Sequence, residues 1–563
     1  MSGEELVYAA LGGAGEIGMN MYLYGFGPEK DRRWIMVDCG VTFGDAGTTP
    51  GVDIILPDVD FIAGQRKRLL GILITHAHED HVGAIGRLWG RLRAPIYTTP
   101  FTAEIAKRKL EEEGVKLDAL KSVRPMNRFT LGPFDAMFHP ITHSVPGAMA
   151  LHVKTPLGAI LHTGDFKFDA EPLIGPPPDE ASLKALGDEG LLCLACDSTN
   201  VLEPGEAGSE ASVRPGIEAL IREASGAVAA TCFASNVARL RTVAQIGRDN
   251  GRSVVVAGRA MRRMIDAALE TRAIPDFPET VSDEDARDLP SEHALYLVTG
   301  SQGESRAALA RIATGQHPTV SLEEGDLVLF SSRTIPGNER EVGRLCNRLS
   351  ERGVRVVDAD HAHIHVSGHG CRDEMRRMYG LLRPQIALPI HGEHRHLAEH
   401  ARMARAWGAE HAMLAPNGML VRLADAAGGP PAHVEEIDSG RVYLDGTTPV
   451  GALDGVIRSR LRLARQGHVS IALVVDEEGE LIADPEVRVT GAPTDGEGWP
   501  SPLDEMIADA VDAAVERMKP KERRSDQQIE EVASAACRRL CDKRWGKKPE
   551  VTAMVIRLEE EEE

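Results

Sequence analysis

His76-Ala-His78-Glu-Asp80-His81 follows directly on the apolar run Gly71-Ile-Leu-Ile-Thr75 and places four metal-binding side chains within six residues. Imidazole and carboxylate groups together suit zinc-like divalent cations. If the chain turns from a strand into a helix near Asp80, His76 and His78 project from the strand end, and the last two ligands point from the first helical turn. One loop then serves two adjacent metal ions, which a polar loop with merely solvated histidines would not do.

Length and composition limit the architecture. A chain of 563 residues is too long for one hydrophobic core, so we expect about two to four domains. The sequence has no run of about 18 uncharged apolar residues, and its N-terminus lacks the basic and apolar segments of a signal peptide. Together with eight scattered cysteines, these features predict a cytoplasmic protein with reduced thiols and no membrane partner.

The net charge of −21 argues on its face against a nucleic-acid partner. Part of the acidic excess, however, lies in the terminal run Leu558–Glu563. A site that holds two divalent cations is also locally positive, whatever the total charge of the chain. Because metal ions, backbone amides and a few side chains suffice to bind phosphate, the net charge does not exclude RNA or DNA.

Short apolar runs alternate with helical patterns along most of the chain. In roughly the first 200 residues this alternation predicts an α/β layered domain. A second α/β pattern follows, and its strands look buried and parallel: Ala227–Thr231, Ser253–Ala257, Ala294–Val298 and Asp326–Phe330. The last part predicts a compact α+β domain with a strand, two helices and a strand: Val469–Val475, Leu503–Met518, Asp526–Asp542 and Val551–Leu558.

The segment Gly13–Gly18 matches the glycine pattern of dinucleotide-binding sites, and Asp38 lies at a fitting distance beyond it. That pattern must open a long helix, whereas Met19–Tyr24 is β-prone and ends in further glycines. We therefore predict a hairpin with a tight glycine turn near the metal site rather than a nicotinamide site. Asp38, at a strand end, is then a carboxylate that supports a metal-binding histidine from behind.

Two metal ions need about seven protein ligands, and further ligand-type residues follow strands downstream: His143, Asp165 and His391. The order of these residues after the opening cluster resembles that of metallo-β-lactamase-fold hydrolases. The resemblance implies that His76, His78 and His143 hold one ion, that Asp80, His81 and His391 hold the other, and that Asp165 bridges them. We expect the rival histidines to serve packing or hydrogen bonds behind the site: His139, His152 and His162.

The long insertion between Asp165 and His391 carries further motifs. Asp197-Ser-Thr-Asn200 resembles the acidic first motif of the β-CASP nucleases, His369 in His365-Val-Ser-Gly-His369 resembles their second, and His391 resembles their third. In that family a histidine at the third position goes with RNA cleavage more than with DNA cleavage. The resemblance therefore favours an RNA substrate.

Several longer motifs resemble the bacterial ribonuclease J family in order and spacing: Leu11–Gly18, Thr75–Ile85, Phe233–Asn236, Gly300–Glu304 and His365–His369. Met19 departs from the pattern, where a basic residue is more common, and the stretch after residue 466 matches only loosely. The fold implied is an α/β metallo-β-lactamase αββα sandwich with an inserted α/β β-CASP domain and a small α+β C-terminal domain. The corresponding ranges are 1–205 and 369–430 for the sandwich, 206–368 for the insertion, 431–465 for a linker, and 466–563 for the C-terminal domain with its acidic tail.

Phosphodiester hydrolysis by two metal ions needs in-line attack and stabilised charge on the attacking and leaving oxygens. We expect Asp80 and His81 to be essential for this catalysis. His369 is a plausible proton donor to the leaving 3′-oxygen, and Asp197 could orient it or share its proton. The alternative for Asp197 is an N-cap or an Asx turn.

A terminal phosphate needs hydroxyls, a guanidinium and backbone amides. The groups expected in such a pocket are Ser331, Arg333, His365, Val366, Ser367, Gly368 and His369. Ser235 and Asn236, at the start of a helix, are either N-caps or, as the resemblance implies, part of the RNA path.

The resemblance implies a 5′-to-3′ exoribonuclease with endonuclease activity that prefers single-stranded RNA with a 5′-monophosphate, in mRNA decay and rRNA maturation. It also implies two divalent ions per subunit, most simply zinc, with manganese or magnesium as options. A homodimer or homotetramer and a partnership with RNA-degradation machinery are further implications. A stripe on Leu503, Ile507 and Val511 could serve assembly, or it could be an intradomain core.

Three other functions remain to be weighed. A small-molecule metallo-hydrolase such as a lactonase would not need the insertion that holds Ser235, Ser331 and His369. A β-CASP DNA nuclease differs only in its substrate. An inactive RNA-binding scaffold is disfavoured because all seven ligand positions are filled, and unpaired buried ionisable groups are costly to keep.

Overall fold

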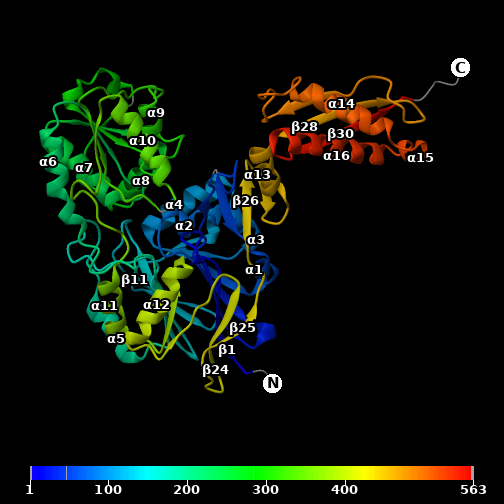
Figure 1. The fold of residues 1–563 in the computed structure, drawn as a ribbon. Helices are drawn as coiled ribbons and strands as arrows, with labels where there is room; N and C mark the ends of the chain where they lie inside the picture. The colour runs from blue at the N-terminus through cyan, green and yellow to red at the C-terminus, as the bar shows by residue number, and fades with distance from the viewer. Residues whose placement is uncertain (1–2, 46, 283, 336, 559–563) are drawn as a thin grey trace. The chain divides into compact units, whose positions relative to one another are not determined.

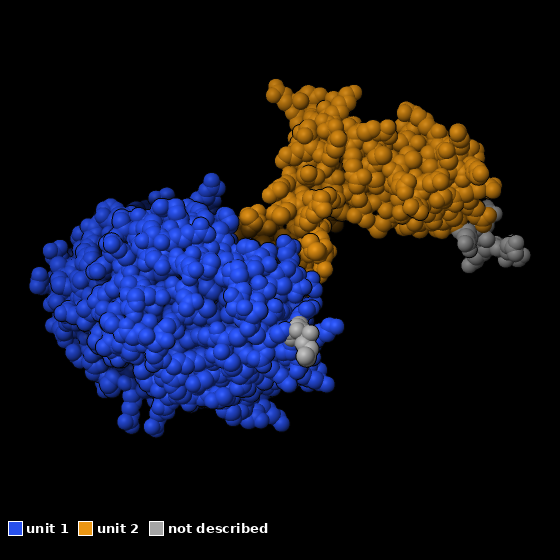
Figure 2. Space-filling model, turned by 90° about the horizontal axis from the view of Figure 1, so that it is seen from below, with its two compact units in different colours: residues 1–42, 56–441 blue, residues 43–55, 442–563 orange. Residues whose placement is uncertain are grey.

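The structure, a computed structural model, describes residues 3–45, 47–282, 284–335 and 337–558. It divides into two compact units (Figures 1 and 2): unit 1 comprises residues 1–42 and 56–441, and unit 2 comprises residues 43–55 and 442–563. The acidic tail at 559–563 lies outside the described residues. Among the described helices, none has the length and apolar character needed to cross a membrane.

Two mixed sheets packed face to face form the larger part of unit 1. The first has the strand order β25 (Ala432–Glu436), β24 (Met419–Asp425), β1 (Glu5–Gly12), β3 (Met21–Gly27), β4 (Arg33–Val37), β7 (Leu69–Leu73), β8 (Ile96–Thr98) and β9 (Leu120–Ser122). The second has the order β10 (Arg128–Leu131), β11 (Phe134–Pro140), β12 (Met149–Thr155), β13 (Gly158–His162), β14 (Cys193–Asp197), β21 (Ile386–Ile390) and β23 (His411–Ala412). Buried side chains from both sheets, such as Tyr8, Tyr22, Phe134 and Phe138, form one hydrophobic core.

Helices complete this sandwich. On the first sheet, α3 (Ile85–Leu92) packs on α4 (Pro100–Glu112), which contacts β8 and β9. On the second, α12 (His394–Ala406) packs on β21, and α5 (Glu180–Glu189) packs on α11 (Arg372–Leu382) (Figure 1). The result is the predicted αββα sandwich.

A third sheet of unit 1 forms the core of the inserted region (green in Figure 1). Its order is β17 (Thr280–Val281), β16 (Ser253–Ala257), β18 (Ala294–Val298), β15 (Val228–Thr231), β19 (Leu327–Phe330) and β20 (Arg355–Val357), with parallel pairing throughout. Its helices are α6 (Arg214–Glu223), α7 (Val237–Asp249), α8 (Arg259–Glu270), α9 (Ala308–Ala313) and α10 (Glu339–Glu351). The four runs expected to be buried and parallel form β15, β16, β18 and β19, which confirms that expectation.

The glycine-rich N-terminal segment forms the predicted hairpin. Strand β1 pairs antiparallel with β3, and between them lies the short strand β2 (Ala14–Gly15), which pairs with β22 (Gly392–Glu393). Gly13, Gly15 and Gly18 have φ angles of 85°, 101° and 104°, a backbone region that residues with a Cβ rarely adopt. The glycines therefore serve a tight return of the chain.

Unit 2 contains a three-stranded sheet with the order β29 (Glu486–Thr490), β28 (His468–Val475) and β30 (Glu550–Arg557). Its core is shared with α14 (Leu503–Glu516) and α16 (Asp526–Trp545), which α15 (Pro520–Arg523) precedes. Leu503, Ile507 and Val511 are buried in this core. These three residues therefore form an intradomain core rather than an assembly surface.

The range expected as a linker, 431–465, is well structured. It holds β25, β26 (Arg441–Asp445), β27 (Thr448–Gly451) and most of α13 (Val456–Gln466). Strands β26 and β27 share a sheet with β6 (Ile54–Pro57) and β5 (Thr42–Phe43). Residues 43–55 therefore belong to unit 2, although their place in the sequence suggested the N-terminal domain.

Candidate metal centre

Strand ends deliver the predicted ligands to one place. His76 follows β7, His143 follows β11, Asp165 follows β13 and His391 follows β21. At the opening cluster the chain leaves β7 and enters a short helix, α2 (Glu79–Val82), with His78 as its N-cap residue in an extended conformation. The predicted turn from strand into helix near Asp80 is thus observed.

One group of ligand atoms comes from His76, His78, His143 and Asp165, which all lie within 4.8 Å of one another. Nδ1 of His78 is 3.2 Å from Nε2 of His76 and 3.1 Å from Nε2 of His143. One Asp165 carboxylate oxygen lies 3.6 Å and 3.7 Å from these two Nε2 atoms. Three imidazole nitrogens and one carboxylate oxygen facing one point form a donor set that suits a zinc-like cation.

A second group comes from Asp80, His81, Asp165 and His391. Nε2 of His81 is 3.2 Å from Asp165 and 3.5 Å from Asp80, and Nε2 of His391 is 3.4 Å from Asp80. Asp165 belongs to both groups. The two groups coincide with the two ligand sets that the family resemblance implied, including the shared carboxylate.

The pKa shifts of these histidines are compatible with cation binding. Burial lowers the pKa of His76 and of His143 well below the usual range, so both stay neutral, as ligands must be. Burial also disfavours a charged His391, but the adjacent Asp165 raises its pKa to about 10. Nε2 of His391 is buried and has no hydrogen-bond partner among the described residues. A cation between these carboxylates would displace that proton and satisfy the orphaned nitrogen.

Groups behind the ligands fix their orientation. Nδ1 of His81 lies 2.7 Å from Asp38, whose carboxylate also accepts hydrogen bonds from the Thr75 backbone N–H and hydroxyl. The Thr75 hydroxyl is 3.0 Å from Nδ1 of His76, so both rings turn Nε2 toward the centre. Asp38 thus has the supporting position expected from the sequence.

Two residues that sequence reasoning missed also reach the centre. The Asn20 amide nitrogen lies 2.9 Å from Nε2 of His81 and 3.3 Å from an Asp80 oxygen, and its carbonyl oxygen accepts a 2.6 Å bond from the Tyr22 hydroxyl. Both side chains are fully buried. The signal was a lone asparagine in a β-prone, otherwise apolar stretch.

Backbone strain marks the same place. Asp38 and His391 have φ angles of 63° and 49°, in the left-handed region that few non-glycine residues adopt, although Asp and His do so more often than most. Gly368 approaches so closely that a Cβ there would lie 2.8 Å from His143 Cε1. Non-glycine residues in strained conformations cluster at functional sites.

Asp197 and His369 lie beside the two groups. Nδ1 of His369 is 2.8 Å from one Asp197 oxygen, and Nε2 of His369 is 3.9 Å from Asp165. The other Asp197 oxygen accepts bonds from the backbone and hydroxyl of Thr199. The local turn and the contact with His369 therefore coexist, one on each carboxylate oxygen.

The residues expected around a terminal phosphate are only partly free. The Ser331 hydroxyl donates to the Ile364 carbonyl, and the exposed Arg333 (63%) pairs with Glu203. Asn236 caps α7 by accepting a bond from the Arg239 backbone, while Ser235 is partly exposed beside it.

The segment between Ile364 and Cys371 lies against the metal centre. The Ser367 hydroxyl accepts bonds from the Asn200 amide and the His369 backbone, and the Gly368 carbonyl lies 2.6 Å from Nδ1 of His143. His365 and Val366 precede them, and Nδ1 of His365 is buried without a partner in the described part of the chain.

The three rival histidines lie outside both groups. His162 contacts the Tyr24 hydroxyl through Nδ1 at 3.1 Å, and His139 and His152 meet edge to face with ring centroids 5.9 Å apart. Each is buried. In this structure His139 and His152 pack on each other, and His162 also makes a hydrogen bond, so none of the three joins either ligand group.

Comparison with known proteins extends this description. Residues 15–211 match the metallo-beta-lactamase superfamily, 225–349 the ribonuclease J beta-CASP domain, 353–414 the Zn-dependent metallo-hydrolase RNA specificity domain, and 455–558 the ribonuclease J C-terminal domain. The last match includes the stretch whose resemblance looked loose in the sequence.

Curated relatives match over nearly the whole chain. Ribonuclease J of Sinorhizobium meliloti is 41% identical over 559 residues, covering 99% of this chain and 98% of the relative. Ribonuclease J of Corynebacterium glutamicum is 35% identical, covering 97% of this chain and 75% of the relative. A solved protein of unknown function from Enterococcus faecalis V583 aligns with a TM-score of 0.51 at 16% identity, covering 74% of this chain and all of that one, and supports the fold alone.

Fold and site together define an RNA-processing metallo-nuclease of the metallo-β-lactamase superfamily. The relatives allow a narrower statement. The chain belongs to the ribonuclease J family, and it is a metal-dependent ribonuclease.

Proposed function

We propose that this protein degrades single-stranded RNA from the 5′ end, also cuts RNA internally, and prefers ends that carry a 5′-monophosphate. The observation that carries the proposal is the position of Asp165, shared by two ligand groups and 3.9 Å from the partly exposed His369. A shared carboxylate between two histidine-rich groups is the arrangement that a two-metal hydrolase requires.

The proposed metal ligands are the seven residues His76, His78, Asp80, His81, His143, Asp165 and His391. When bound, two divalent cations supply charge neutralisation at the phosphate and an acidified water. These nitrogen and oxygen donors accept zinc as well as manganese, so zinc is proposed first and manganese or magnesium as alternatives.

His369 is the proposed proton donor to the leaving 3′-oxygen. Although burial lowers the pKa of His369, Asp197 and Asp165 raise it above its usual value. The two carboxylates therefore favour the protonated ring that a general acid needs. Asp197 holds Nδ1, which leaves Nε2 to face the reacting phosphate.

The preference for a monophosphate is assigned to segment 365–368, with Ser331 and Arg333 behind it. This segment offers the Ser367 hydroxyl, an imidazole with a buried unpartnered nitrogen at His365, and backbone groups. A pocket fitted to one phosphate would exclude a triphosphate by size and charge. Ser235 is proposed to lie along the RNA path.

The cellular role is proposed from membership of the ribonuclease J family. Ribonuclease J proteins are named for RNA cleavage, and we infer roles in mRNA decay and rRNA maturation in the cytoplasm, as a homodimer or homotetramer that associates with RNA-degradation machinery.

The test compares matched RNAs of one sequence with a 5′-monophosphate, a 5′-triphosphate or a 5′-hydroxyl, each labelled uniformly along the chain, with single-stranded DNA alongside. We expect fastest turnover of the monophosphorylated RNA and release of mononucleotides from its 5′ end. Equal turnover of all RNA ends would overturn the end preference, and equal turnover of DNA would favour a β-CASP DNA nuclease instead.

A further inference from the structure

A fully buried arginine lies outside the metal centre, in the first turn of α7. The guanidinium of Arg239 is 0% exposed and forms a two-pronged ion pair with Glu210, in which Nε donates to one oxygen at 2.5 Å and Nη2 to the other at 2.9 Å. Arg239 belongs to the inserted region, whereas Glu210 lies at the crossing into it. No motif of the sequence singled out either residue.

The remaining guanidinium nitrogen of Arg239 holds the start of the segment that carries His369. Nη1 donates to the Ser331 hydroxyl at 2.6 Å, to the Ser331 carbonyl at 3.0 Å and to the Ile364 carbonyl at 2.8 Å. The Ser331 hydroxyl itself donates to the Ile364 carbonyl at 2.6 Å. Two donors therefore fix this carbonyl, five residues before His369.

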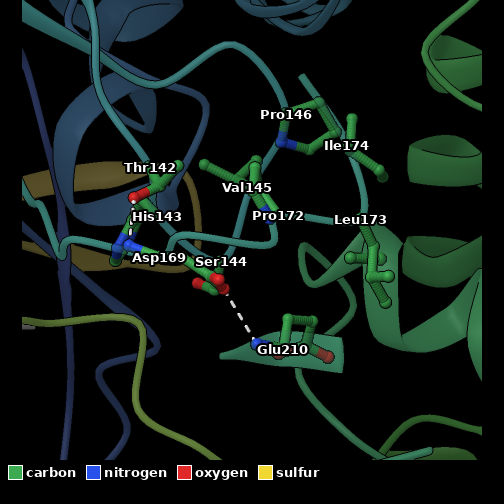
Figure 3. Close-up of a pocket in the computed structure, with 11 residues that line it drawn as sticks. Thr142, His143, Ser144, Val145, Pro146, Asp169, Pro172, Leu173, Ile174 and Glu210 are labelled. Atoms are coloured by element: carbon green, nitrogen blue, oxygen red, sulfur yellow. Dashed lines mark hydrogen bonds between the residues drawn. The ribbon is translucent and has the colours of Figure 1, made fainter. Parts of the chain in front are cut away.

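Glu210 is tied to the metal centre from the opposite side. Its backbone N–H donates to Asp169 at 2.8 Å, and the Asp169 backbone N–H donates to the Thr142 hydroxyl at 3.0 Å (Figure 3). Thr142 directly precedes His143, whose Nδ1 lies 2.6 Å from the Gly368 carbonyl. Both ends of segment 364–369 are thus connected to His143. Gly368 contacts it directly, and Ile364 is linked to it through the chain of hydrogen bonds that begins at Arg239.

A buried ion pair is a poor device for stability, because the loss of hydration offsets most of the attraction between the charges. Its directional hydrogen bonds, however, define one geometry where an apolar contact would allow several. All three acceptors of Nη1 lie on Ser331 or on Ile364, which begins the His369 segment. The arrangement therefore restrains the backbone that presents His369.

We propose that Arg239 is a positioning residue for RNA hydrolysis: paired with Glu210, it holds Ser331 and the Ile364 carbonyl and thereby places His369 against the metal centre. The inference rests on the proposed role of His369 as proton donor. The side chain of Arg239 bonds to Glu210, Ser331 and Ile364 and to none of the seven proposed metal ligands, so its role is to position His369.

The test is a double-mutant cycle on the full-length, metal-loaded protein. Arg239→Met, His369→Ala and the double variant are compared by single-turnover cleavage of 5′-monophosphorylated RNA at saturating enzyme. We expect Arg239→Met alone to slow cleavage about 100-fold, as misplacement of a catalytic group by about 1 Å can do. In the His369→Ala background the same change should alter the rate by no more than about twofold, because coupled residues are not additive.

Two further variants serve as a replacement and as a control. If Arg239→Met does not fold, Ser331→Ala replaces it in the same cycle, because it removes one contact to Ile364 and leaves the ion pair in place. Arg248→Met, on an exposed arginine of the same helix that pairs with Asp249, is the matched control. It should leave the rate within about twofold, as expected for surface substitutions.

The outcomes separate the inference from the function on which it rests. If Arg239→Met, or Ser331→Ala in its place, slows cleavage by the same factor with and without His369, the residue acts only through general stability, and the inference is wrong while the ribonuclease assignment stands. If His369→Ala retains full activity, the proposed proton donor is wrong and the inference falls with it. Metal content and thermal midpoint, measured on every sample, show whether each variant is folded and loaded.

Discussion

The metal centre and the Ser331–Arg333 region contain similar polar side chains but use them differently. At the centre, imidazole nitrogens face one another and Asp165 at 3.1–3.7 Å, and Nε2 of His391, though 3.4 Å from Asp80, has no hydrogen-bond partner in the described chain. Around Ser331, the hydroxyl and the neighbouring guanidinium of Arg239 have their hydrogen bonds satisfied by the protein.

This difference separates a candidate cation site from a structural network. Buried polar groups are normally satisfied within the fold, whereas the centre gathers imidazole nitrogens and two carboxylates around a buried His391 nitrogen, a donor set that suits a cation. A satisfied set indicates a scaffold. We therefore propose the centre as the site of the ions, and we propose that Ser331 contributes mainly by fixing the adjacent segment.

The largest effect is expected when the shared carboxylate of Asp165 is removed from the metal centre. Asp165→Ala should reduce RNA cleavage to the detection limit and lower the metal content, because both ligand groups lose a member. Asp80→Ala or His81→Ala should also abolish cleavage. Gel assays of labelled RNA and elemental analysis of the same samples provide the measurement. Asp135→Ala, on the exposed side of β11, is the control and should retain both properties.

The second prediction concerns chemistry without loss of ions. His369→Ala should slow cleavage roughly 10²–10⁴-fold, the contribution typical of a positioned proton donor, while two metal ions per chain remain. Single-turnover rates and metal analysis decide it. Loss of both ions in this variant would instead make His369 a ligand, since its ring nitrogen lies within 4.8 Å of ligand-type atoms of Asp165, Asp197 and His391.

The third prediction tests the support behind the ligands. Asp38→Asn keeps the shape of the side chain but weakens its bond to His81, so metal affinity should fall about 10–100-fold. Competition with a chelator of known affinity measures this change. Activity at saturating metal should recover in large part; unchanged affinity would show that the Asp38 contact does not tune the centre.

The smallest expected effect distinguishes a helix cap from an RNA contact at Asn236. Asn236→Ala removes the N-cap hydrogen bond of α7 and should lower the free energy of unfolding by about 1 kcal/mol, as for other N-caps. Asp179→Ala, which removes the equivalent cap of α5, is the matched control. Neither variant should change KM for RNA, and a raised KM for Asn236→Ala alone would place Asn236 along the RNA path.

Much of the centre could be predicted because each ligand follows a strand. The sequence places Asp165 and His391 after strands, and the family resemblance implied that they share one centre; in the structure both follow parallel strands of one sheet, with β14 between them. Asn20 was not found although it stands out as a lone asparagine in a β-prone stretch, and Arg239 was not found because its contacts depend on backbone positions that no local pattern encodes. The placement of residues 43–55 in unit 2 was missed for the same reason, since strand pairing over a long sequence distance leaves no periodicity.

The pocket residues show the opposite limit. Ser331 and Arg333 have the right chemistry for phosphate, but residue type does not reveal that Arg239 already occupies the Ser331 hydroxyl or that Arg333 pairs with Glu203. Hydrogen-bond satisfaction is a property of the folded chain, so a residue's type and its place in the sequence do not determine it.

The most direct test of the central claim is the metal stoichiometry of the active protein. Full-length protein is purified without chelators, and bound divalent ions per chain are counted on the same sample whose RNA cleavage is measured, before and after chelation and reloading. The account predicts two ions per chain, loss of cleavage when they are removed and recovery when they return. Undiminished RNA cleavage by protein that retains less than one ion per chain would contradict it.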